Sequence, residues 1–97
     1  MTASKQRGAE ELRTQIATLE AELADAERSL AALGTQMRAV EASAMNAIRS
    51  GKDYEARAFL IEQRSKIEDA AAIEADIKVL RAILDECYDF SRSMGLR

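Results

Sequence analysis

The sequence predicts an all-α protein, an antiparallel two-helix coiled-coil hairpin that dimerises into a four-helix arrangement. The first observation is composition: the 97 residues include no proline, 4% aromatics and 32% charged residues, which is typical of long helices. The second is that apolar residues recur roughly every 3.5 residues in both halves of the chain, the period of a coiled-coil seam. The third is a single polar interruption, residues 50–53, between the halves. Together they predict one helical hairpin domain over residues 1–97.

The first helix is expected over about residues 4–49. Its apolar residues follow one another at alternating steps of four and three without a break, and charged residues fill the positions between them. Such a stripe is a coiled-coil seam. The seam consists of Leu12, Ile16, Leu19, Leu23, Ala26, Leu30, Leu33, Met37, Val40, Ala44 and Ala47. Gly34 lies off this seam, and because the pattern continues across it we expect a glycine tolerated inside the helix, with a break there as the alternative.

The tip of the hairpin is expected at residues 50–53. Gly51 lacks the Cβ that penalises a left-handed residue at a helix end. Arg49 places a cation near the carbonyl end of the first helix. Asp53 is expected to cap the second helix, with Glu55 in its first turn.

The second helix is expected over about residues 54–93 and carries a second, less regular seam. Its polar members, Gln63 and Lys66, can set the register of a coiled coil at a cost in stability. The seam consists of Ala56, Phe59, Gln63, Lys66 or Ile67, Ala70, Ile73, Ile77, Leu80, Leu84, Cys87, Ser91 and Met94. The two seams mirror each other about a point between Gly51 and Lys52, so that Leu19 is expected to face Leu84.

The second helix has more apolar residues than one seam uses. Val79, Ile83 and Phe90 form a further stripe at steps of four and seven, and Ile61 and Tyr88, like Leu60, also fall off the primary seam. A helix that is apolar on two sides packs against two partners. We therefore expect these residues to bind a second copy of the chain, giving a homo-oligomer that is a dimer or larger. The alternative is that they widen a single core face.

The sequence offers no set of catalytic groups. Without histidine, no Ser–His or Cys–His pair can form, and the Glu-x-x-His ligands of helical-bundle metal sites are also absent. Asp85, Glu86 and Asp89 are interpreted as a solvated face, and Cys87 as a small apolar residue of the seam. The expectation is a protein that is not an enzyme and binds no metal or cofactor.

Charge and hydropathy narrow the class of partner. The formal net charge is −3, and nucleic-acid binding would call for a basic face. No segment is apolar for long enough to span a membrane, the N-terminus lacks a secretory apolar region, and one cysteine makes no internal disulfide. We expect a cytoplasmic protein with a protein partner; a membrane surface as partner has weaker support, because no basic amphipathic helix is present.

Residues 42–69, ASAMNAIRSGKDYEARAFLIEQRSKIED, resemble the hairpin tip of phage-shock protein A and its plastid relative, the vesicle-inducing protein. The resemblance implies a bacterial relative of the membrane-remodelling superfamily that includes ESCRT-III, whose members polymerise and bind stressed membranes. It also implies a truncated relative, since the family's membrane-inserting N-terminal helix and the helices after the hairpin are not in the sequence. The matching positions are Ala44, Ala47, Ile48, Gly51, Asp53, Ala56, Arg57, Ala58, Leu60, Glu62 and Gln63.

Two functions fit these observations. The first is a coiled-coil scaffold or self-assembly module, which the resemblance extends to a truncated phage-shock protein A-like protein of membrane stress. The alternative is a small regulator or inhibitor of a kind common among phage and mobile-element products, which binds one other protein through a helix face. Replacement of Ile83 or Phe90 by glutamate should abolish self-association in the first case and binding of a different protein in the second.

Overall fold

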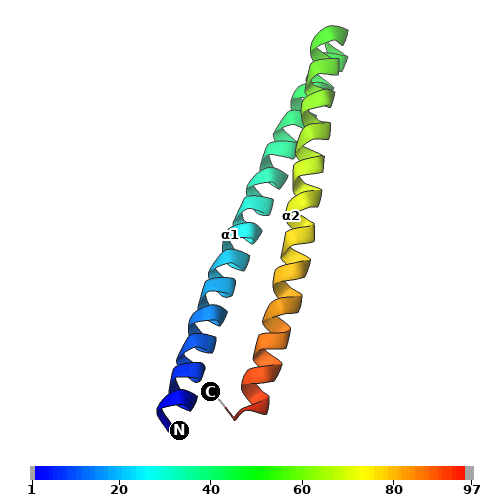
Figure 1. Ribbon diagram of the computed structural model, residues 1–97. Coiled ribbons are helices and arrows are strands. Elements are labelled where there is room, and N and C mark those ends of the chain that lie inside the picture. Colours follow the sequence, from blue (N-terminus) through cyan, green and yellow to red (C-terminus); the bar gives the residue numbers. More distant parts are fainter. Residues whose placement is uncertain (1, 96–97) are drawn as a thin grey trace. The chain divides into compact units, whose positions relative to one another are not determined.

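The structure is a computed structural model that describes residues 2–95 of the chain and the side chains of residues 4–95. Two long helices account for nearly all of this range: α1 spans Thr2–Arg49 and α2 spans Asp53–Ser93 (Figure 1). The prediction of an all-α helical hairpin is confirmed. The observed helices begin one or two residues earlier than expected, and α1 is continuous through Gly34 as predicted.

The tip of the hairpin is a tight turn built around Gly51. This residue has a φ of 70°, the left-handed conformation in which glycine carries no Cβ penalty. The Lys52 amide donates to the Ala47 carbonyl at 2.8 Å and the Gly51 amide to the Ile48 carbonyl at 3.1 Å. These two bonds form a Schellman motif, which satisfies carbonyls left unpaired at the end of α1.

The start of α2 differs in one detail from the prediction. The Lys52 carbonyl accepts the first helical hydrogen bond, from the Ala56 amide at 2.9 Å. Lys52 is therefore the residue that precedes the helix, and Asp53 lies in its first turn with Glu55 instead of capping it. Both carboxylates still lie where the helix dipole favours negative charge.

The contacts between residues divide the chain into two compact units. We call Glu27–Ala75 the tip unit, and Met1–Ala26 together with Asp76–Arg97 the end unit. The expectation of a single domain stays a prediction.

In the tip unit, the second half of α1 and the first half of α2 run antiparallel; Figure 1 colours them from cyan to green and from green to yellow, respectively. Small side chains dominate its core, which lets two helix backbones approach closely. The Lys66 ammonium crosses between the helices and donates to Gln36 Oε1 at 3.0 Å. The buried side chains are Val40, Ala44, Ala47, Ala56 and Ala70.

In the end unit, the first half of α1 runs antiparallel to the second half of α2 (blue and orange in Figure 1). Ala9, Ile77 and Leu84 are buried here, and Leu12, Ile16 and Leu19 are half-buried. Gly95, with a φ of 70°, follows the end of α2, and its amide donates to the Arg92 carbonyl at 3.0 Å.

The exposure of the side chains supports both predicted seams. Every predicted position of the first seam is buried or half-buried. In the second seam, Lys66 is half-buried whereas Ile67 is exposed, so the lysine occupies the position that the sequence left open. Met94 was wrongly assigned to the seam: it is exposed, because α2 ends at Ser93 and the chain turns away at Gly95.

Candidate functional site

The predicted stripe of Val79, Ile83 and Phe90 lies on α2 in the end unit, and the structure leaves it uncovered. The exposed fractions are 58% for Val79, 39% for Ile83 and 56% for Phe90. In the isolated chain these side chains keep much of their surface exposed, and whether they widen the core or bind another molecule stays a prediction. They form an exposed apolar surface of α2. This surface lies outside the seam through which α2 packs against α1.

A shallow groove adjoins this stripe. It has a volume of about 370 Å³, and apolar atoms make up most of its lining. Ile83 is the most exposed apolar residue that lines the groove. An apolar side chain from another molecule that entered the groove would therefore contact Ile83. The groove is lined by Thr14, Gln15, Thr18 and Leu19 from α1 and by Ile83 and Cys87 from α2.

Tyr88 is placed differently from the other predicted partner-binding residues. It is half-buried, and its hydroxyl donates a hydrogen bond of 2.7 Å to Glu20 Oε2 of α1. This bond, the burial of the ring and the negative charges of Glu20 and Asp85 raise the pKa of Tyr88 above its ordinary value of 10.0. Tyr88 thus has a partner within the end unit, and its role toward a second molecule stays a prediction.

Ile61 belongs to the tip unit, where it is 71% exposed. It lines a surface hollow of about 390 Å³ together with Arg57, Leu60 and Arg64. Within residues 4–95, neither arginine takes part in an ion pair. Ile61 and Leu60 are among the surplus apolar residues of the sequence, and here they lie beside two cations on the same helix.

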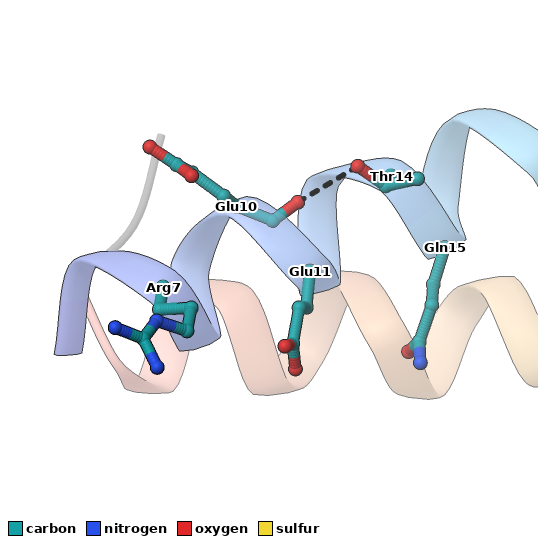
Figure 2. A pocket seen from close by; sticks show the side chains of 5 residues that line it. All are labelled: Arg7, Glu10, Glu11, Thr14 and Gln15. Atoms are coloured by element: carbon teal, nitrogen blue, oxygen red, sulfur yellow. Dashed lines mark hydrogen bonds between the residues drawn. The ribbon is translucent and has the colours of Figure 1, made fainter. Parts of the chain in front are cut away.

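Another hollow, of about 400 Å³, lies on α1 near its start (Figure 2). Arg7, Glu11 and Gln15 point to one side of the helix there, and Glu10 points away. The Thr14 hydroxyl donates to the Glu10 carbonyl at 3.0 Å. This mixture of one cation and two carboxylates at helical spacing is typical of a solvated face.

Neither metal-binding nor membrane-spanning geometry is found in the described part of the chain. No group of three or more histidine, cysteine, aspartate or glutamate side chains is placed to hold a metal ion there. No helix among the described residues is long and apolar enough to cross a membrane. Cys87 is a half-buried free thiol at the edge of the groove, as expected for a seam residue.

No protein-family model, curated protein or solved structure matches the chain significantly. The resemblance of residues 42–69 to the phage-shock protein A family therefore stays a prediction.

Proposed function

We propose that the protein is a non-enzymatic self-assembly module, a helical hairpin that associates with copies of itself through the outer face of α2. The observation that carries this proposal is the exposure of Val79, Ile83 and Phe90 beside an apolar groove. Removing such side chains from water is the main driving force of protein association.

The small core of the hairpin also favours association. Among the described residues, no large side chain is fully buried, and most of the buried positions are alanines. Full burial of a valine, isoleucine or phenylalanine contributes about 1.5–3 kcal/mol, so a half-exposed side chain leaves roughly half of that ungained. Small chains commonly obtain the missing stabilisation by oligomerising.

The test is the absolute mass of the protein in solution, measured by light scattering over a hundredfold range of concentration. We expect the mass to rise with concentration from that of one chain to that of two or more. Ile83→Glu and Phe90→Glu should shift this rise to higher concentration while circular dichroism shows the helix content unchanged. Ile48→Glu is the matched control, because Ile48 is also half exposed but lies on α1 in the tip unit.

Two other outcomes would decide against the proposal. A single chain at all concentrations would overturn it. A fixed small species that Phe90→Glu leaves unchanged would favour the alternative, a regulator that uses this face for a different protein.

A further inference from the structure

The first half of α2, in the tip unit, carries a second coiled-coil pattern on a face that α1 leaves exposed. Residues on this face follow one another at steps of four and three, and all of them are exposed. Its two large members are Tyr54, 87% exposed, and Ile61, 71% exposed. This spacing is that of a coiled-coil seam. We call the face the tip stripe, and it consists of Tyr54, Ala58, Ile61 and Ser65.

Charges of opposite sign lie along the two sides of the tip stripe. At 3.6 residues per turn, Arg57 and Arg64 lie along one side. Three carboxylates lie along the other side: Glu55, Glu62 and Asp69. In a coiled coil these are the g and e positions, whose charges select the partner helix and its orientation. None of the five side chains takes part in an ion pair within residues 4–95.

We propose that two copies of the chain pair through their tip stripes, with the two α2 helices parallel and in register. In a parallel pair, each g position lies beside the e position that follows it on the other helix. Arg57 then meets Glu62 of the second copy, and Arg64 meets Asp69 of the second copy. Two-fold symmetry forms each of these ion pairs twice.

The charges favour a parallel second copy over an antiparallel one. An antiparallel pair places g positions beside g positions and e positions beside e positions. Arginine would then lie beside arginine, and carboxylate beside carboxylate, and like charges repel. The cationic side of one tip stripe is complementary to the acidic side of an identical stripe only when the two helices run in the same direction.

This contact goes beyond the self-association proposed above, because it lies wholly in the tip unit. It uses none of the end-unit residues Val79, Ile83 and Phe90. The two surfaces can therefore be disrupted separately, by substitutions in different units.

Glu68 limits the length of the contact. It is the next residue at the same spacing, and in the parallel register it meets Glu68 of the second copy. The two carboxylates repel each other, so Glu68→Leu should lower the dissociation constant of the pair several-fold. Glu74→Leu makes the same exchange at an exposed position of the tip unit outside the contact, and it should have little effect.

Charge reversal tests the ion pairs. The background is Phe90→Glu, which weakens the end-unit surface, and the measurement is mass against concentration. Arg57→Glu combined with Arg64→Glu should raise the dissociation constant about tenfold, since four attractive pairs become repulsive. Adding Glu62→Lys and Asp69→Lys to the same chain should restore association. In an antiparallel contact the first exchange would only replace one like-charge pair by another.

Thiol cross-linking tests the orientation in a Cys87→Ser protein. A short bifunctional thiol reagent should join Ala58→Cys to itself, and likewise Ser65→Cys to itself. An antiparallel contact can do this at one of the two positions at most, because a residue meets its own copy only at the two-fold axis. Ala42→Cys, at an exposed position of α1, is the control for random collisions. Cys87→Ser alone must keep the wild-type helix content and mass.

The outcomes separate this contact from the proposed function. A Phe90→Glu protein that stays a single chain at all concentrations overturns the tip contact and leaves the proposed function standing. Charge reversal without weakening, or weakening without rescue, overturns the ion pairs and with them the pairing. Self-cross-linking at only one position, or at neither above the rate of Ala42→Cys, overturns the parallel register. A wild-type protein that is monomeric throughout overturns both proposals.

Discussion

The Tyr88 hydroxyl and Glu20 Oε2 are joined by a hydrogen bond of 2.7 Å between α2 and α1. In the predicted register Tyr88 faces Gln15, so the bond reaches beyond the directly opposite residue. Side chains on a helix lean toward its N-terminus. In an antiparallel pair, Tyr88 and Glu20 therefore lean toward each other, which explains how they meet.

The first prediction concerns the ionisation of Tyr88. Its hydrogen bond to Glu20 holds the proton, and the negative charge of Glu20 opposes a phenolate beside it, so the pKa of Tyr88 lies above 10.0. In a Tyr54→Phe protein, Tyr88 is the remaining tyrosine. The ultraviolet absorbance of its phenolate should appear at higher pH in the folded protein than in denaturant.

The raised pKa of Tyr88 makes the free energy of unfolding depend on pH in a defined direction. The folded state keeps the Tyr88 proton where the unfolded chain, with a pKa of about 10.0, loses it. The stabilisation is complete below that pH and is lost as pH rises through the folded pKa. Glu20→Gln removes the charge but keeps an acceptor, so it should move the titration back toward 10.0; an unchanged titration would contradict this explanation.

The second prediction concerns the turn at Gly51. Gly51→Ala should lower the free energy of unfolding by about 1–2 kcal/mol, the cost of placing a Cβ in a left-handed residue. Apart from Gly51 itself and its two neighbours in the chain, no heavy atom lies within 4 Å of the position that this Cβ would occupy, so the cost comes from the backbone conformation. Chemical denaturation measures the change. Gly51→Asn is the control and should lose less, because asparagine tolerates this conformation.

The third prediction has the opposite sign and concerns Gly34. Gly34→Ala should raise the free energy of unfolding by about 1 kcal/mol, because alanine has the higher helix propensity. The new Cβ would meet only the flexible end of Arg38, with Nη1 at 3.7 Å. Gly8→Ala, close to the start of α1, should give a smaller gain, because helix ends fray. A loss of stability at Gly34 would contradict this explanation.

The fourth prediction tests the alanine-rich packing near the tip. Ala44 is 2% exposed, so Ala44→Leu has no space for its added carbons and should cost about 1–3 kcal/mol. Ala42→Leu adds the same group at an exposed position of α1 and should leave the thermal midpoint nearly unchanged. Equal effects of the two substitutions would contradict the packing described for the tip unit.

Most of the fold could be predicted because a coiled-coil seam follows directly from the spacing of apolar residues along the sequence. The steps of four and three between Leu12 and Ala47 depend only on helix geometry, and all of those positions are buried or half-buried. The left-handed conformation of Gly51 could also be predicted, because glycine has no Cβ that penalises it.

The features that residue spacing could not predict depend on contacts that long side chains make with the other helix, and on where each helix ends. The choice of Lys66 over Ile67 rests on a hydrogen bond to Gln36 of the other helix, which no single-helix pattern contains. The exposure of Met94 follows from where α2 ends. Spacing alone places Tyr88 among the outer apolar residues, because its partner Glu20 lies 68 positions away in the sequence.

The turn at Gly51 also has a consequence for how the chain folds. The bond between Lys66 and Gln36 joins residues 30 positions apart, whereas that between Tyr88 and Glu20 spans 68. Closing a long loop costs more entropy than closing a short one. The pairing of α1 with α2 should therefore begin next to the Gly51 turn and proceed toward the two chain ends. Gly51→Ala should then slow folding, whereas Tyr88→Phe should mainly speed unfolding.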